Sequence, residues 1–213
     1  ALGLVAIFLV YLSFKNSKDR SIRGWSIFLL FFICCQGLFG YLTVSLKLLP
    51  IIVTTHLFGG FATLTLFYFL YLKSRNFEIF NQINISNLKA IAGVAFLVLI
   101  VQIFLGVWTS TNYASLACAD FPTCQGSYLP EMDFKSGFNL NQEVGPNYLY
   151  GLLDNPARVA IHYSHRVTAI LVTILFLILM SRLWFSNAAP LASTLGILLL
   201  TQITLGIINV VYV

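Results

Sequence analysis

Long runs of apolar residues, separated by short polar segments, dominate the chain. Five of these runs are close to the ~20 residues that an α-helix needs to cross the hydrocarbon core of a bilayer. They cover residues 25–46, 51–72, 90–108, 159–183 and 191–213. A shorter run, residues 1–14, lacks the basic segment that opens a signal peptide and fits the tail of a transmembrane helix better. The pattern predicts an all-α fold, a polytopic transmembrane helical bundle with five full spans and part of a sixth.

Composition and charge support a membrane protein and suggest its orientation. Of the 213 residues, 59% are hydrophobic and 9% are charged, which is too little polar surface to cover a water-soluble globule. Most basic residues lie in alternate loops, namely Lys15, Lys18, Arg20, Arg23, Lys73, Arg75, Lys89 and Arg182. Because basic loops stay on the cytoplasmic side, the long loop 112–157 is predicted to lie outside. The net charge of +5 is spread over separate loops and forms no basic, aromatic stripe for nucleic acid.

A short motif recurs in three of the apolar runs. Gln36–Gly40, Gln102–Gly106 and Gln202–Gly206 each place a glutamine four residues before a glycine. A role in helix packing is the favoured interpretation, because a glutamine in hydrocarbon needs a partner and a glycine lets helices approach closely.

The positions of this motif predict an internal repeat. If Gln36 and Gln202 are equivalent, the offset of 166 residues places a counterpart of His56 near residue 222 and a counterpart of His165 just before residue 1. We therefore expect two tandem four-helix repeats in a chain that lacks the first two helices and the last. Residues 1–73 would belong to the N-terminal repeat, 74–89 to a cytoplasmic linker, and 90–213 to the C-terminal repeat.

His56 and His165 are the main candidates for chemistry. Ionisable side chains within a membrane are costly, so they are functional candidates by default. Each lies two or three turns into a helix that is predicted to start at the outer face, one near Pro50 and one near Pro156. Neutral imidazole is a common ligand of haem iron, and a helical bundle can hold a porphyrin between facing histidines. Hydrogen bonding between helices is the alternative, whereas zinc would need further ligands that no thiolate or carboxylate is spaced to provide.

Other polar residues lie near His165 in sequence. His162, one turn earlier on the same helix face, can bind a ligand, move protons or form hydrogen bonds. Arg166 calls for an anionic partner such as a haem propionate, unless its side chain extends to the outer interface. In the outer loop, Cys118 and Cys124 are predicted to form a disulfide in an oxidising compartment. A structural role in shaping the loop is favoured over electron exchange.

Four segments together resemble one known family. These are residues 112–126 (NYASLACADFPTCQG), 151–158 (GLLDNPAR), 160–166 (AIHYSHR) and 36–44 (QGLFGYLTV). Their motifs and order closely resemble the haem A synthase family over essentially the whole chain. The cysteine loop followed by His165-Arg166 is the most specific part of this match.

The resemblance implies an eight-helix oxidoreductase built of two similar four-helix halves. Enzymes of this family oxidise a methyl group of haem O to the formyl group of haem A for terminal oxidases. By motif, His56 would be a haem iron ligand of the N-terminal pocket and His165 of the C-terminal pocket, with His162 and Arg166 as possible haem contacts. One pocket would hold the substrate haem O and the other a haem b that relays electrons. The catalytic glutamate of the family falls upstream of this chain, so no catalytic residue is assigned, and no other metal is expected.

The resemblance also implies a location and partners. We expect an integral protein of the bacterial cytoplasmic (inner) membrane, with the mitochondrial inner membrane as the alternative. Haem O, haem A and the lipid bilayer are the expected partners, together with haem O synthase and an electron donor, and a homo-oligomer is left open. A b-type cytochrome that only passes electrons remains a rival function. A transporter built from repeats is disfavoured, because the runs contain few proline breaks.

Overall fold

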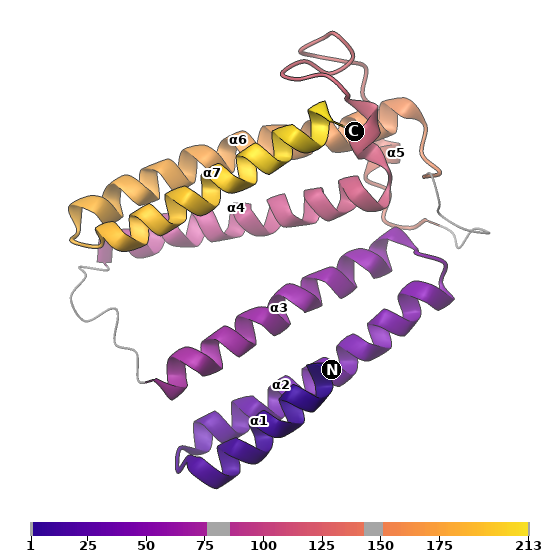
Figure 1. The fold of residues 1–213 in the computed structure, drawn as a ribbon. Helices are drawn as coiled ribbons and strands as arrows, with labels where there is room; N and C mark the ends of the chain where they lie inside the picture. The colour runs from indigo at the N-terminus through magenta and orange to yellow at the C-terminus, as the bar shows by residue number, and fades with distance from the viewer. Residues whose placement is uncertain (1, 76–85, 143–150, 213) are drawn as a thin grey trace. The chain divides into compact units, whose positions relative to one another are not determined.

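The computed structural model describes residues 2–75, 86–142 and 151–212, which form two compact units (Figure 1). The first unit contains α1 (Leu2–Asn16), α2 (Arg20–Ser45) and α3 (Pro50–Ser74). The second contains α4 (Ser86–Thr111), η1 (Ala114–Ala117), α5 (Phe134–Gly137), α6 (Asn155–Phe185) and α7 (Ala189–Val211). Most of the predicted linker, residues 74–89, and residues 143–150 of the predicted outer loop lie outside the described residues. The boundaries predicted for the two repeats therefore stay predictions.

The predicted helical membrane bundle is confirmed. Each apolar run becomes a helix, and five helices are long and apolar enough to cross a membrane, while Leu2–Asn16 is shorter. Several helices extend past the predicted runs, as at Arg20 and Thr111, because a helix can continue beyond the hydrocarbon into polar surroundings. The described ranges contain no β-strand, only an isolated bridge between Cys124 and Ser127.

Local sequence explains where the helices begin. Asp19 caps α2, because its carboxylate accepts a hydrogen bond from the Ser21 N–H at 2.7 Å. α3 begins at Pro50 and α6 begins one residue before Pro156, where the missing N–H of proline has no bond to lose. These starts confirm the two predicted from the prolines, although the Asp154 side chain makes no capping hydrogen bond.

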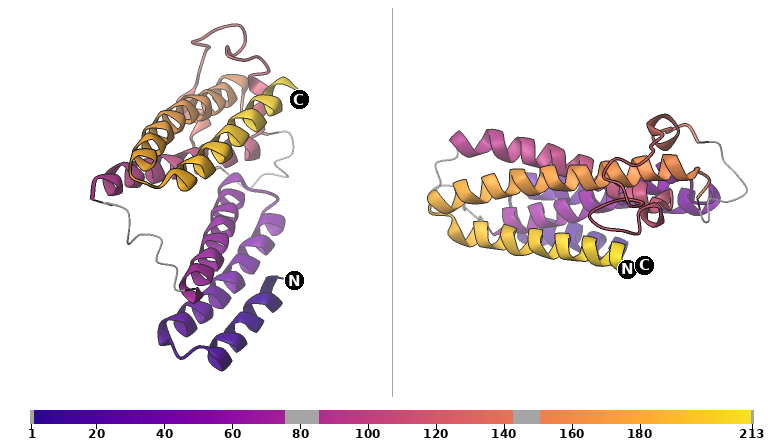
Figure 2. Two further views of the ribbon diagram at one scale, coloured as in Figure 1. Left: turned by 60° about the vertical axis from the view of Figure 1, so that its left-hand side comes forward. Right: turned by 90° about the horizontal axis from the view of Figure 1, so that it is seen from above.

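The first unit is a row of three helices that leaves most apolar side chains exposed. α2 packs between α1 and α3 (Figure 2). Leu29 is fully buried, yet Val44 is 75% exposed and Leu64 is 66% exposed. Helix sides of this kind are stable against lipid tails, which are as apolar as the side chains themselves. Thr54 and Thr63 satisfy their hydroxyls within α3 by donating to carbonyl oxygens one turn earlier.

The second unit carries at one end the described parts of the loop that joins α4 to α6. α6 packs against α4 and α7 (Figure 2), and the short helix α5 lies against the start of α6. Trp108 of α4 is fully buried, and its indole N–H donates to the Gly137 carbonyl oxygen at 2.8 Å. A Cβ at Gly137 would lie 2.7 Å from the Ala157 carbonyl oxygen, so only glycine permits this approach. The loop is thus tied to both α4 and α6.

We predict that Trp108→Phe destabilises the second unit by about 1–3 kcal/mol, because the buried Gly137 carbonyl loses its donor. The free energy of unfolding, measured by SDS titration in mixed micelles, checks this value. Trp184→Phe is the matched control, since Trp184 is 57% exposed and should change stability by less than about 0.5 kcal/mol. Equal effects of the two substitutions would contradict the anchoring role of Trp108.

Candidate functional site

The His165 imidazole lies between α6 and α4. His165 is ten residues after the first residue of α6, about 15 Å along the helix axis. The Gln102 amide nitrogen on α4 is 3.1 Å from Nδ1 of His165 and 3.5 Å from Nε2. One turn further along α4, a Cβ at Gly106 would lie 3.1 Å from Cε1 of the same ring. The ring edge around Cε1 therefore faces Gln102 and Gly106.

His56 has a similar neighbourhood in the first unit. It lies six residues after Pro50 on α3, and a Cβ at Gly40 of α2 would be 3.3 Å from its Cε1. Gln36, one turn before Gly40, packs its amide group against Gly59, so a Cβ at Gly59 would displace the end of the Gln36 side chain. Nδ1 of His56 is buried and has no hydrogen-bond partner among the described residues. Each unit thus places one histidine beside a Gln-Gly motif on the preceding membrane-spanning helix.

The polar atoms of His162 bond to the protein itself. This side chain is 4% exposed, and its Nδ1 lies 3.0 Å from the Ala114 carbonyl oxygen, which can only accept a hydrogen bond. Nδ1 must therefore carry the proton, and Nε2 accepts from the Arg166 Nε–H at 3.2 Å. Both ring nitrogens are occupied, so His162 joins α6 to η1 in this structure.

Arg166 holds the cysteine loop against α6. Its two terminal nitrogens donate to the carbonyl oxygens of Thr123, Cys118 and Asp120 at 2.7, 2.8 and 2.9 Å. The guanidinium carbon also lies 5.8 Å from the centre of the Phe121 ring. A planar guanidinium with five donors suits such a set of converging carbonyl oxygens. The residue next to His165 in sequence therefore fixes the loop that follows η1.

The loop itself is closed by a disulfide and by an aspartate. Cys118 and Cys124 are joined by a disulfide, with their Cα atoms 4.7 Å apart, and both pack against the buried Val159 of α6. The Asp120 carboxylate accepts hydrogen bonds from the Thr123 hydroxyl and from the Gly126 and Gln125 amides. Led by the Thr123 bond, these interactions lower the pKa of Asp120 from 3.8 to about 2.

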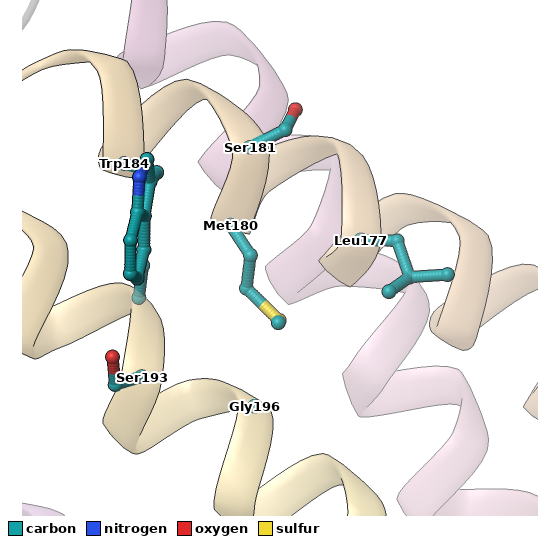
Figure 3. A pocket seen from close by; sticks show the side chains of 7 residues that line it. Leu177, Met180, Ser181, Trp184, Ser193 and Gly196 are labelled. Atoms are coloured by element: carbon teal, nitrogen blue, oxygen red, sulfur yellow. The ribbon is translucent and has the colours of Figure 1, made fainter.

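The second unit also has a hollow, and neither His165, Arg166 nor the two disulfide-bonded cysteines line it. It has a volume of about 250 Å³ and lies between α6 and α7, where Met180 points toward Gly196 and Trp184 extends toward Ser193 (Figure 3). Leu177 is twelve residues beyond His165, about 18 Å along α6. The hollow is therefore separate from the histidine site.

Comparison with known proteins identifies the family. A model of the COX15-CtaA family, described as cytochrome oxidase assembly protein, matches residues 1–213. The chain belongs to this family. Over 212 residues, this family member is 39% identical to the haem A synthase of Shewanella oneidensis, a match that covers 99% of the chain and 64% of that protein. It is 30% identical to the haem A synthase of Rickettsia felis, over 96% of the chain and 60% of that protein.

The chain spans less than two thirds of the length of either relative. No solved structure matches it. The predicted membership of the haem A synthase family is confirmed, whereas the roles of individual residues stay predictions.

Sequence patterns located some of the site but not its contacts. His165, Arg166, Cys118 and Cys124 were singled out, and the structure brings them together at one end of the second unit. The contact between Gln102 and His165 was missed, although the Gln-Gly motif was visible as a repeat. The available signal was that the motif occurs on the membrane-spanning helix that precedes each histidine-bearing helix.

We predict that Arg166→Lys loosens the cysteine loop, because one ammonium group cannot replace the forked contacts to three carbonyl oxygens. Amide hydrogen exchange over residues 117–126 should become about 10-fold faster or more, as expected when a charge-assisted hydrogen bond is lost. Arg182→Lys, on the exposed far end of the same helix, is the control and should leave exchange unchanged. Unchanged exchange in Arg166→Lys would show that the loop does not depend on Arg166.

We predict that the Asp120 carboxyl titrates with a midpoint near 2 in the folded loop. Because its pKa is lowered on folding, the carboxylate stabilises the loop fully above pH 3.8, and this contribution is lost as the pH falls through about 2. The chemical shift of the carboxyl carbon, followed by NMR from pH 6 downwards, gives the midpoint. A reduced linear peptide of residues 117–127 is the control and should titrate near 3.8. A midpoint near 3.8 in the intact protein would refute the proposed set of bonds to Asp120.

Proposed function

We propose that the protein is a haem A synthase, an oxidoreductase that converts a methyl group of haem O to the formyl group of haem A for terminal oxidases. The observation that carries the proposal is an imidazole held at a helix interface in each unit of a chain whose relatives are named haem A synthase. The chain spans less than two thirds of the length of those relatives, so the activity is a proposal for the whole protein to which these residues belong.

His56 and His165 are the proposed haem iron ligands, one in each unit. Neutral imidazole is the donor that haem iron takes most often from helices, and both rings are partly buried between apolar helices. Nδ1 of His56 is a buried nitrogen without a partner among the residues that the structure describes, which supports a ring that binds a ligand other than protein. His162 fits a ligand role less well, because both its nitrogens already have protein partners. His162 and Arg166 stay predicted haem contacts.

The reaction explains why a dry helical frame is useful. Converting a methyl to a formyl group replaces two hydrogen atoms by one oxygen atom and removes four electrons from the carbon, so the reaction also needs an external oxidant that accepts these electrons and a source of the oxygen atom. A bound haem supplies the redox metal that oxidation of an unactivated methyl group requires. The residues of the chain would orient the porphyrin through His56 and His165, while the apolar helix sides keep water from the reacting edge. The loop held by Arg166 would cover the end of the second unit.

The proposal includes a location and partners. The bacterial relatives and the five membrane-crossing helices support the cytoplasmic membrane of a bacterium, with loop 112–157 on the outer side. Haem b as a resident cofactor, haem O synthase as the source of substrate and a separate electron donor are further parts of the proposal. A b-type cytochrome that leaves haem unchanged is the second candidate, because it would use the same ligands.

We predict that the whole protein makes haem A when it is expressed in a bacterium that produces haem O but lacks its own haem A synthase. His165→Leu or His56→Leu should abolish this production of haem A. Leucine keeps an apolar side chain at each position but removes the donor nitrogen. Chromatography of extracted haems measures the product, and absorption spectra of the purified protein measure bound haem. Each substitution should lower the haem content of the protein.

Two outcomes would decide against parts of this proposal. Bound haem with no haem A in the extracts would favour the electron-transfer cytochrome. Unchanged haem content and spectra in both histidine variants would remove the proposed ligands. Gly60→Ala is a suitable control on α3, because a Cβ at Gly60 would have no heavy atom within 4 Å.

A further inference from the structure

The Gln-Gly motif lies against an imidazole in both units. Gly106 faces Cε1 of His165, and Gly40 faces Cε1 of His56, at 3.1 and 3.3 Å from a Cβ built at each glycine. Such distances are shorter than ordinary van der Waals contact, so alanine at either position would push the ring or the helix aside. The two units reach this arrangement with different helix pairs, α2 with α3 and α4 with α6. A motif that serves packing alone would not need a ring at both glycines.

The glutamine of the motif supplies the polar side of the same contact. In the second unit, the Gln102 amide nitrogen lies 3.1 Å from Nδ1 of His165 and 3.5 Å from Nε2, and the buried amide oxygen has no partner among the described residues. A half-turn about the terminal torsion exchanges these two atoms, and this torsion has two broad, nearly equivalent positions. The amide oxygen then accepts the Nδ1–H of the ring.

We propose that Gln102 and Gly106 are positioning residues for His165, and that Gly40 sets how close the His56 ring lies to α2. This inference rests on the proposed haem ligation. A ring that binds iron through one nitrogen needs its other N–H fixed by an acceptor, which sets the tautomer and the ring orientation. Gln102 provides that acceptor, and Gly106 sets how close the ring lies to α4. Gln36 packs against Gly59 on the same helix as His56, and its buried amide oxygen has no hydrogen-bond partner among the described residues.

In the third copy of the motif, no imidazole of the described residues packs against the glycine. A Cβ built at Gly206 has no heavy atom within 4 Å, and both Gln202 and Gly206 are exposed on α7. Within the described part of the chain, this copy of the motif packs α7 against no other helix through its glycine. Gln202 and Gly206 carry no part of the proposal.

The test uses three substitutions on α4 in the protein as its gene encodes it. Gln102→Leu removes the acceptor, Gln102→Glu keeps an acceptor oxygen at similar reach, and Gly106→Ala crowds the ring. Gly93→Ala is the matched control, because it is the same change on the same helix with no atom within 4 Å of the new Cβ. Two readouts are used: haem affinity with the electron paramagnetic resonance signature of the loaded protein, and the tautomer of His165 by nitrogen NMR of the haem-free protein.

We expect Gln102→Leu to weaken haem binding by about 10- to 100-fold and to shift the His165 tautomer ratio, as for other partners that orient a metal ligand. Gln102→Glu should restore the tautomer. Gly106→Ala should change the resonance signature, whereas Gly93→Ala should match the wild type. If Gly106→Ala does not fold, the Gln102 pair still decides the question, because its readout needs no change at Gly106.

Failure of this inference is distinguishable from failure of the proposed function. If His165→Leu loses haem but Gln102→Leu and Gly106→Ala match Gly93→Ala in both readouts, the positioning role is wrong and the ligand role stands. If His165→Leu keeps its haem, the ligand role is wrong. A wild-type tautomer in haem-free Gln102→Leu overturns the positioning role in either case.

Discussion

Polar side chains within the membrane-spanning helices need partners inside the protein, because hydrocarbon offers them none. Most of the side surface of the helices is apolar and exposed, so the few polar contacts between helices have a large influence on how helices pair. The contact of Gln102 with His165 joins α4 to α6, and the contact of Gly40 with His56 joins α2 to α3. The polar constraint is met between helices in the second unit, whereas in the first unit His56 packs on Gly40 and its Nδ1 has no partner among the described residues.

The need of buried polar groups for partners also explains how the cysteine loop is attached to α6. Arg166 lies one residue after His165, where a guanidinium without partners would be costly. Three carbonyl oxygens of the loop satisfy it, and the disulfide and Asp120 keep those oxygens in place. Trp108 and Gly137 tie the other half of the loop to α4 and α6. A loop so attached has a fixed shape beside the proposed ligand.

The partners of Arg166 differ from those expected from the sequence, which were an anion such as a haem propionate or the outer interface. In the structure the guanidinium makes four hydrogen bonds, one to His162 and three to carbonyl oxygens of the cysteine loop. A contact with haem, which stays a prediction for Arg166, would have to share these donors.

The sequence by itself determined the helices, because five of the apolar runs are long enough to cross a membrane and the runs are bounded by polar residues or proline. It also pointed to His56, His165, Arg166 and the two cysteines, since such residues are rare and costly beside long apolar runs. Only the tertiary structure decided which of them meet. The contact of Gln102 with His165 depends on how α4 and α6 are rotated about their axes, and the carbonyl oxygens bound by Arg166 depend on the path of the loop. Neither is encoded by local spacing, because backbone carbonyls are the same at every position and nearly uniform apolar helices leave their rotation to packing.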